Sequence, residues 1–493
     1  MKFTELVEKL KRAGLNFTVQ NFSDTELDFL TADSRKAKPK TIFACVKGEH
    51  ADGHVFAQKA VKQGASALVC EHVLNINVPQ LICRDVRSNM GIIGANLYDN
   101  PADKLKLIAI TGTTGKTTST FMTKAILDYA NIKCGLLGTV YYDDGACVEE
   151  ASRTTPEADM VQYKLAQMVK NGCKACVMET SSHSIVQGRI TGCKYDVAGF
   201  TNLTQDHLDF HKTMQSYFNA KLQLFDTFMR GAWKVSIFID DKYGKEVFEK
   251  FSEHAVSYSL KDSSADYFAQ VLSTSINGTK IKLKIGEKTT VVDFPIIGSH
   301  NILNALQALS IANMLAVDTQ TAIEALKQMP QIPGRLERYM IEGRGSCVID
   351  FAHAPDGMEK LLTALRTVCK GKLISLFGAG GDRDKTKRPK MGEIAAKLSD
   401  FVILTTDNPR SEEPDDIIDM IEEGVRGHAA EYIRITNRKE AIYKGLSMLH
   451  EGDILAVIGK GPETYMEIKG EKIPFLDKAI LLKWCEKEGM KIK

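Results

Sequence analysis

The sequence predicts an α/β fold divided into three domains. With 493 residues, the chain is longer than one ordinary domain. Short continuous apolar runs alternate with segments of helical periodicity, a pattern typical of parallel sheets covered by helices on both faces. Several of these runs end in Gly- or Asp-rich loops, where open α/β sheets bind their ligands. We expect the domains to span residues 1–101, 102–334 and 335–493.

The first predicted domain is a small α/β domain. Its opening segment, "MKFTELVEKLKRAGLNF", alternates charged and apolar residues like an amphipathic helix and lacks the apolar core of a signal peptide. Strands are expected at "TIFACVKG", "ASALVCE" and "VPQLICRDV", with a helix at "HVFAQKAVKQG". No stretch of the chain approaches the roughly 18 apolar residues that a membrane crossing needs.

The other two predicted domains carry longer series of buried strands. In the central domain, "KLKLIAITGTTGKTTSTF" is a strand, a Gly-rich turn and the start of a helix, and strands follow at "CKACVMETSSH", "YDVAGFTNLT" and "WKVSIFIDD". In the C-terminal domain, "GSCVIDFAH", "GKLISLFGAGG", "DFVILTTDNPR" and "GDILAVIGKGPE" predict a Rossmann-like open sheet.

Charge and cysteine usage exclude several classes of function. The 64 basic and 62 acidic residues leave a net charge of +2, which gives no electrostatic case for nucleic acid or an anionic membrane as a partner. The 11 cysteines are scattered, and the only close pair is Cys173 and Cys176. Because zinc needs four ligands and no second pair follows, we expect buried thiols there. Reduced thiols indicate a cytoplasmic protein.

The segment "GTTGKTT" has the composition and context of a phosphate-binding loop. Gly112, Gly115, Lys116 and Thr117 follow a predicted strand and open a predicted helix. Glycines let backbone N–H groups close around phosphate oxygens, and the helix N-terminus adds partial positive charge. Lys116 is expected to reach the β- and γ-phosphates, and the Thr117 hydroxyl to bind Mg²⁺. Only two residues separate the glycines instead of four, which disfavours a GTPase or a common P-loop kinase.

Acidic and basic residues after the next strands are candidate metal ligands. Glu179 ends an apolar strand, where a carboxylate can hold Mg²⁺. A further group follows a later strand and is either a metal site or a set of solvated loop residues: Asp206, His207, Asp209 and His211. Lys221 lies on a predicted helix among apolar residues, and without a family context it is a lysine with its head in water.

The motifs together resemble the Mur ligase family over nearly the whole chain. They are "TGTTGKTT", "METSSH", "FTNLTQDHLDFH", "YFNAKLQLF", "GSHNILNALQAL", "PGRLE", "DFAHAPDG" and "TTDNPRSEEP". The resemblance implies a central ATPase domain of the P-loop type, in which a substrate carboxylate receives the γ-phosphate of ATP and an amine then attacks the acyl phosphate. It is strongest for members that add meso-diaminopimelate to UDP-N-acetylmuramoyl-L-alanyl-D-glutamate, a step of peptidoglycan synthesis. It implies two Mg²⁺ ions and a monomer.

The resemblance also implies a role for individual residues. For ATP it implies Gly112, Thr113, Thr114, Gly115, Lys116, Thr117 and Thr118 at the phosphates, with Asn301, Arg335 and Asp350 on the adenosine side. For the metals it implies Thr117 and Glu179 at one ion, and His207 with N-carbamylated Lys221 at the other. For the UDP substrate it implies Ser34, Glu49, His50 and Ala51 at the uridine end, and Thr154, Thr155, Ser181, Gln187 and Arg189 at the muramoyl-dipeptide. For the amino acid it implies Arg383, Asp407, Asn408, Pro409, Arg410, Gly459 and Glu463.

Arg410 in "DNPR" favours meso-diaminopimelate over L-lysine. The two amino acids share the amine to be acylated, but only diaminopimelate carries a distal carboxylate, which a planar guanidinium binds through two hydrogen bonds. Alternatively, Arg410 is a surface residue paired with Glu412 or Glu413. Three positions depart from the family pattern: Pro462 replaces a histidine in "GKGPE", and His300 and Phe351 replace other aromatic residues.

Three other functions share some of these features. A ligase like folylpolyglutamate synthetase has the same phosphate loop and lysine chemistry but is not expected to carry "ADSR", "GEHADG" or "DNPR". A P-loop kinase needs no amine pocket, and a nucleotide-gated binding protein need not keep Lys116, Glu179, His207 and Lys221 together.

Overall fold

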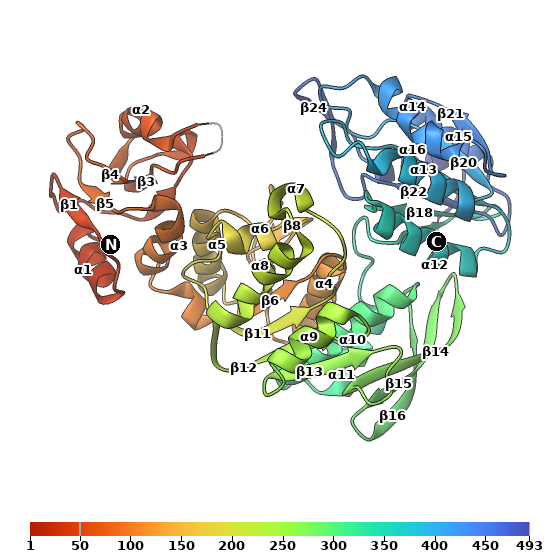
Figure 1. The fold of residues 1–493 in the computed structure, drawn as a ribbon, viewed down its shortest axis with the longest axis horizontal. Helices are drawn as coiled ribbons and strands as arrows, with labels where there is room; N and C mark the ends of the chain where they lie inside the picture. Colours follow the sequence, from red (N-terminus) through yellow and green to blue (C-terminus); the bar gives the residue numbers. More distant parts are fainter. Residues whose placement is uncertain (49–50, 493) are drawn as a thin grey trace. The chain divides into compact units, whose positions relative to one another are not determined.

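The computed structural model describes residues 1–48 and 51–492 and contains two compact units (Figure 1). Unit 1 comprises Met1–Asp266 and Gln307–Ala325, and unit 2 comprises Tyr267–Leu306 and the chain from Leu326 onward. The helices α10 (Ser299–Met314) and α11 (Thr319–Gln328) carry residues of both units. None of the helices in the described part of the chain combines the length and apolar character that a membrane crossing requires.

The N-terminal part of unit 1 is a five-stranded sheet with the order β1-β5-β4-β3-β2. All neighbours pair in parallel except β1 and β5. The strands are β1 (Thr18–Gln20), β2 (Phe29–Thr31), β3 (Thr41–Ala44), β4 (Ala65–Cys70) and β5 (Gln80–Ile82), and the helices are α1 (Phe3–Arg12), α2 (Ala57–Lys62) and α3 (Val86–Leu97). The two helices and three strands predicted for this domain are confirmed as α1, α2, β3, β4 and β5, whereas β1, β2 and α3 were not predicted.

The rest of unit 1 is built on a second sheet with the order β13-β12-β11-β6-β10-β7-β8-β9. The strands from β13 to β7 pair in parallel, and β8 and β9 add an antiparallel edge. They are β6 (Lys106–Thr111), β7 (Cys134–Leu137), β8 (Tyr141–Asp143), β9 (Val148–Glu150), β10 (Ala175–Glu179), β11 (Tyr195–Phe200), β12 (Met229–Phe238) and β13 (Ala255–Ser259). The helices are α4 (Lys116–Tyr129), α5 (Ala158–Lys170), α6 (Ser182–Val186), α7 (Leu208–His211), α8 (Met214–Thr227) and α9 (Lys242–Lys250).

Unit 2 contains an antiparallel meander and a largely parallel six-stranded sheet. The meander is β14 (Tyr267–Ser275), β15 (Gly278–Ile285) and β16 (Lys288–Phe294). The sheet has the order β17-β18-β22-β19-β20-β21, with only β17 antiparallel, and comprises β17 (Glu337–Met340), β18 (Ser346–Asp350), β19 (Leu373–Phe377), β20 (Phe401–Leu404), β21 (Glu431–Arg434) and β22 (Ile454–Ile458). The hairpin β23 (Tyr465–Ile468) and β24 (Glu471–Pro474) follows, and the helices are α12 (Pro355–Val368), α13 (Lys387–Leu398), α14 (Pro414–Val425), α15 (Arg438–Ser447) and α16 (Asp477–Lys487).

Both faces of the C-terminal sheet are buried, which explains its continuous apolar strands. On β19, Leu373 and Phe377 belong to one hydrophobic cluster, and Ile374 and Leu376 belong to another. Successive side chains of a strand point to opposite faces, so a sheet covered by helices on both sides needs apolar residues at every position. The parallel α/β sheets that the sequence predicts are therefore confirmed, whereas the meander β14–β16 was not predicted.

Candidate active site

The phosphate loop connects β6 to α4, as the sequence predicts. Gly112 has a φ of 143° and Gly115 a φ of 86°, both in the region that favours glycine. A side chain on Gly112 would collide with the Thr201 hydroxyl, so the loop approaches the end of β11 as closely as glycine allows. The N-terminus of the 14-residue helix α4 follows at once, and its backbone N–H groups and dipole favour an anion.

The loop after β11 fixes the shape of the phosphate loop through Asn202. The Thr113 N–H donates to the Asn202 carbonyl at 2.9 Å. The Thr114 N–H donates to Asn202 Oδ1 at 3.1 Å, and Asn202 Nδ2 donates to the Thr114 carbonyl at 3.1 Å. Asn202 lies inside the quoted motif "FTNLT", but nothing in the sequence alone indicated this reciprocal pairing.

Glu179 and Thr117 lie together, as predicted for one metal. Glu179 is fully buried at the end of β10, and the Thr117 hydroxyl donates to its Oε2 at 3.0 Å. The Thr139 N–H donates to Oε1 at 2.7 Å and the Thr139 hydroxyl to Oε2 at 3.0 Å. These hydrogen-bond donors are all neutral, and a buried carboxylate needs a cation to offset its charge. Carboxylate and hydroxyl oxygens are ligands that Mg²⁺ accepts, so the site fits this ion.

Lys221 is buried in the phosphate-loop region, and the alternative that its head lies in water is wrong. It lies on α8, is 1% exposed, and its Nζ donates to the Gly112 carbonyl at 2.8 Å. Lys116 Nζ donates to the same carbonyl at 2.9 Å and to that of Thr113 at 2.7 Å. Burial, and then the positive charge of Lys116, lower the pKa of Lys221 well below its ordinary value. Lys221 therefore meets Lys116 at the carbonyl oxygen of Gly112, a residue 109 positions before Lys221 in the sequence.

Three histidine rings lie beside this lysine. The rings of His183 and His207 are 4.7 Å apart, and the rings of His183 and His211 are 5.6 Å apart. Partial burial lowers the pKa of His207, whose side chain is 44% exposed; Asp206 raises this pKa, whereas the neighbouring Lys116 and Lys221 lower it further. A neutral imidazole is the form that binds metals. His211 contacts the Ser182 hydroxyl at 2.9 Å and is buried, so it is not a solvated loop residue.

The other two acidic candidates of this loop contribute less. Asp206 lies 3.4 Å from His207 Nε2, and Asp209 is exposed. Within the described residues, no three His, Cys, Asp or Glu side chains gather into a ready-made metal cage.

The residues predicted to hold the muramoyl-dipeptide form one hydrogen-bonded network. The Thr155 hydroxyl donates to the Glu179 carbonyl at 2.7 Å and lies 3.4 Å from the Ser181 hydroxyl. Arg189 donates to the Thr155 carbonyl at 3.1 Å and to Gln187 Oε1 at 2.6 Å. Thr154 joins through the Thr139 hydroxyl at 3.2 Å. The network is therefore continuous with the Glu179 carboxylate.

The predicted uridine contacts lie in the N-terminal part of unit 1. Ser34 is buried and begins a short 3₁₀ turn capped by Asp33, whose side chain accepts the Arg35 N–H at 3.0 Å. Ala51 is exposed. Glu49 and His50 lie outside the described residues.

The predicted adenosine residues lie in unit 2. Asn301 is buried, and its Nδ2 donates to the Ile297 carbonyl at 2.9 Å. The Arg335 guanidinium lies over the Phe351 ring at 4.8 Å. Burial raises the pKa of Asp350, and the positive charge of Arg335 opposes this rise. Arg335 and Asp350 are therefore close neighbours, and the replacement of the usual residue by Phe351 leaves a ring under the guanidinium.

The predicted amino-acid residues converge at the carboxyl ends of β19, β20 and β22. Asn408 Nδ2 donates to Glu463 Oε2 at 2.7 Å. Arg410 Nη1 donates to the Gly381 carbonyl at 2.6 Å, and Arg383 lies beside it across Gly380. Gly459 has a φ of 112°, and any side chain there would meet the Asp407 carboxylate. Arg410 does not pair with Glu412 or Glu413; its partner is Glu467, at 3.2 Å.

Pro462 leaves this arrangement in place. It lies next to Glu463, and its ring contacts the backbone at Gly334, where a side chain would have no room. Lys460, a neighbour that the sequence analysis did not single out, is fully buried and donates to Glu463 Oε2 at 2.9 Å. Asn408 and Lys460 therefore both bind the Glu463 carboxylate next to Pro462.

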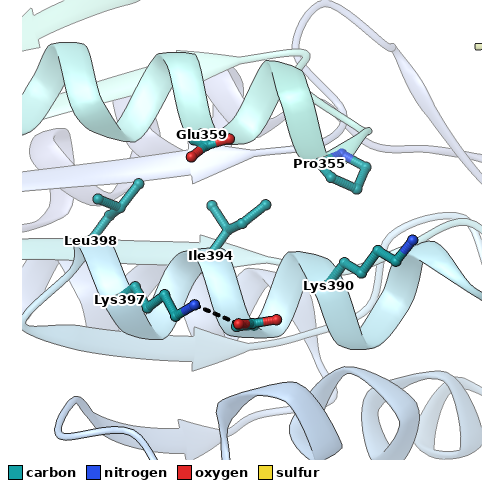
Figure 2. Close-up of a pocket in the computed structure, with 7 residues that line it drawn as sticks. Pro355, Glu359, Lys390, Ile394, Lys397 and Leu398 are labelled. Atoms are coloured by element: carbon teal, nitrogen blue, oxygen red, sulfur yellow. Dashed lines mark hydrogen bonds and ion pairs between the residues drawn. The ribbon is translucent and has the colours of Figure 1, made fainter. Parts of the chain in front are cut away.

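A separate depression of about 250 Å³ lies between α12 and α13 in unit 2 (Figure 2). It is lined by Pro355, Glu359, Lys390, Glu393, Ile394, Lys397 and Leu398. The ion pair between Lys397 and Glu393, drawn as a dashed line, joins two residues of one helix. No predicted site residue lines this depression.

Comparison with known proteins identifies the class. Three Mur ligase models match successive segments: the Mur ligase family catalytic domain at residues 26–107, the Mur ligase middle domain at 110–312 and the Mur ligase glutamate ligase domain at 334–461. Together with the phosphate loop and the α/β sheets, these matches define a ligase. The chain belongs to the Mur ligase family.

Individual relatives match over nearly the whole chain. It is 42% identical to UDP-N-acetylmuramoyl-L-alanyl-D-glutamate–2,6-diaminopimelate ligase 1 of Clostridium acetobutylicum, over 93% of this chain and 94% of that protein. It is 41% identical to the ligase of the same name from Caldanaerobacter subterraneus subsp. tengcongensis, over 97% and 98%. A solved structure of a UDP-N-acetylmuramoyl-L-alanyl-D-glutamate–2,6-diaminopimelate ligase superposes with a TM-score of 0.66 and 30% identity, covering 94% of this chain and 95% of that chain. These matches exclude the kinase and binding-protein interpretations.

Proposed function

We propose that the chain joins meso-diaminopimelate to UDP-N-acetylmuramoyl-L-alanyl-D-glutamate, with ATP, in peptidoglycan precursor synthesis. The observation that carries the proposal is the convergence of Lys116 and Lys221 on the Gly112 carbonyl, beside the buried carboxylate of Glu179. The names of relatives that match over 93% or more of the chain support the substrates.

The reaction forms one amide and consumes one ATP. The D-glutamyl carboxylate attacks the γ-phosphorus of ATP, the bond to ADP breaks, and an acyl phosphate forms. The amine of meso-diaminopimelate then attacks the acyl carbon through a tetrahedral intermediate, loses a proton, and inorganic phosphate leaves. Lys116 offsets the repulsion between the two anions in the first step. Mg²⁺ held by Thr117 and Glu179 would add positive charge at the phosphates.

The chemistry of Lys221 fits the proposed carbamate. Its lowered pKa favours the neutral amine, which can add to CO₂ and release a proton to give an N-carboxylate. That product exchanges a positive group for a negative one beside Lys116, and it relieves the repulsion between the two ammonium groups. The carbamate and His207 would then hold the second metal ion.

The remaining roles are proposed from the contacts within each group. Ser34, Thr155, Ser181, Gln187 and Arg189 hold the UDP substrate, and Asn301, Arg335 and Asp350 hold the adenosine. Arg410 and Arg383 receive the distal carboxylate of meso-diaminopimelate, which L-lysine lacks. We assign the three roles to residues 1–101, 102–334 and 335–493. We further propose that the chain is a monomer. We also propose that it acts in the cytoplasm, since its 11 cysteines are all free thiols.

A panel of amino acids tests the proposal. The purified chain is given ATP, Mg²⁺ and UDP-N-acetylmuramoyl-L-alanyl-D-glutamate, and phosphate release is measured with meso-diaminopimelate, L-lysine or no amine. We expect release to depend on both the nucleotide substrate and the amine, with meso-diaminopimelate preferred. Comparable kcat/KM values for L-lysine would contradict the choice of amino acid, and activity with a folate acceptor would favour the folylpolyglutamate-synthetase-like alternative.

A further inference from the structure

Two side chains outside the predicted site hold the charged residues of the amino-acid pocket. Lys460 is fully buried and donates three hydrogen bonds, to Asn408 Oδ1 at 3.1 Å, to Glu463 Oε2 at 2.9 Å and to the Tyr465 carbonyl at 2.7 Å. Glu467, on β23, accepts from Arg410 Nε at 3.2 Å. Neither Lys460 nor Glu467 belongs to the residue set that the family resemblance implies for the amino acid.

Lys460 fixes one edge of the Glu463 carboxylate. Oε2 accepts from both Lys460 and Asn408, and Oε1 has no hydrogen-bond partner among the residues that the structure describes. The Glu463 side chain is 27% exposed, so part of it lies at the surface. Because two donors hold Oε2, the carboxylate has one orientation rather than several.

Glu467 holds one side of the Arg410 guanidinium, as Lys460 holds one side of the Glu463 carboxylate. Nε donates to Glu467 and Nη1 to the Gly381 carbonyl, while Nη2 has no hydrogen-bond partner in the described part of the chain. The backbones are also joined, since the Arg410 N–H donates to the Glu467 carbonyl at 3.0 Å and the Lys469 N–H to the Arg410 carbonyl at 2.7 Å. Arg410 has a φ of 51°, an uncommon conformation that these bonds maintain.

We propose that Lys460 and Glu467 are positioning residues that set the amino-acid specificity. Lys460 orients Glu463 toward the distal ammonium of the substrate, and Glu467 orients Arg410 toward the distal carboxylate. The inference rests on the proposed function, because it takes meso-diaminopimelate as the amino acid. A fixed hydrogen-bonding group discriminates strongly, since an analogue that lacks the matching charge leaves the protein group unpaired.

Two analogues separate the two roles. L-2-Aminopimelate lacks only the distal amine of diaminopimelate, and L-lysine lacks only its distal carboxylate. In Lys460→Met, we expect the preference for meso-diaminopimelate over L-2-aminopimelate, as a ratio of kcat/KM, to fall about tenfold. The preference over L-lysine should stay unchanged. In Glu467→Gln, we expect the preference over L-lysine to fall and the preference over L-2-aminopimelate to stay unchanged. The KM values for ATP and for the UDP substrate should stay at wild-type levels in both variants.

Controls distinguish positioning from folding. Lys472→Met removes a lysine whose Nζ lies 3.9 Å from the Tyr465 ring on the same hairpin but contacts neither Glu463 nor Arg410, and it should leave both ratios unchanged. Lys460→Arg restores the charge and should recover part of the ammonium preference. An equal rise in the KM of all three amino acids in Lys460→Met would overturn the inference. If Lys460→Met fails to fold, Lys460→Arg and Glu467→Gln decide. Wild-type ratios in both of these variants would then overturn the inference. A wild-type enzyme inactive with meso-diaminopimelate would overturn the proposed function as well.

Discussion

The phosphate-loop region of unit 1 and the amino-acid pocket of unit 2 arrange their charges in opposite ways. In the first, Lys116 and Lys221 share the Gly112 carbonyl, and burial, followed by the like charge of Lys116, lowers the pKa of Lys221. In the second, two of the cations each have an anion beside them: Lys460 pairs with Glu463, and Arg410 with Glu467. Gathered positive charge suits a polyanion such as ATP, whereas alternating charge suits a zwitterionic amino acid.

The comparison also predicts which region is chemically reactive. A lysine crowded by another cation has a large share of neutral amine and can react as a nucleophile. A lysine bonded to a carboxylate acts as a structural donor. The following predictions test this difference, and they run from the largest expected effect to the smallest.

The largest effect is expected at Lys116. Lys116→Ala should lower kcat by about 10²–10³-fold or more, because the β- and γ-phosphates lose a fixed positive charge. Circular dichroism should show an unchanged fold. Lys124→Ala, which removes an i,i+4 partner of Asp128 on the same helix, is the matched control and should retain activity. Near wild-type turnover of Lys116→Ala at saturating ATP would contradict the assignment of this segment as a phosphate loop.

The next effect is expected at Lys221. Lys221→Ala should be nearly inactive and should recover partly with added short carboxylates, which can occupy the place of a carbamate. Enzyme prepared without bicarbonate and CO₂ should lose activity reversibly. A mass increase of the wild-type chain by one CO₂, absent from Lys221→Ala, would be the direct measurement. Full activity of the alanine variant would show that Lys221 is only a structural donor to Gly112.

A smaller, substrate-specific effect is expected at Arg410. Arg410→Ala and Arg410→Lys should raise the KM for meso-diaminopimelate about 10- to 100-fold with unchanged KM for ATP, since lysine cannot offer two parallel hydrogen bonds. Steady-state kinetics with each substrate varied in turn measures this. An equal rise in the KM for ATP would place Arg410 outside the amino-acid pocket.

The smallest effect concerns stability and pH. The Arg388 guanidinium, bonded to Glu412 at 2.8 and 2.9 Å, lowers the pKa of that carboxyl from 4.5 to about 2. A lowered folded-state pKa stabilises the fold above the unfolded value, and this contribution is lost as the pH falls from about 5 toward 2. Glu412→Gln should therefore cost about 1–2 kcal/mol at pH 7 and flatten the pH dependence of unfolding. Glu413→Gln, in an exposed pair with Lys469, should change neither.

Much of the fold could be predicted from the sequence because the signals are local. Continuous apolar runs indicated the parallel strands, and "GTTGKTT" after a strand indicated the phosphate loop with both of its positive-φ glycines. The meander β14–β16 was missed, although "TKIKLKI" alternates as a half-exposed strand does, with Ile281 and Leu283 buried between exposed lysines. Thr139 was missed because nothing local distinguishes a threonine that will meet a carboxylate 40 residues away.

The sequence by itself determined the order of the motifs along the chain, the phosphate loop and the residue types that the reaction needs, since these depend on neighbours along the chain. Only the tertiary structure decided which charges meet. Lys221 could have carried its charge in water, but the packing of α8 buries it against Gly112, and Arg410 bonds Glu467 rather than Glu412 or Glu413. Such partners lie tens of residues apart, and electrostatic energy depends on distance and burial in space, which a sequence pattern does not record.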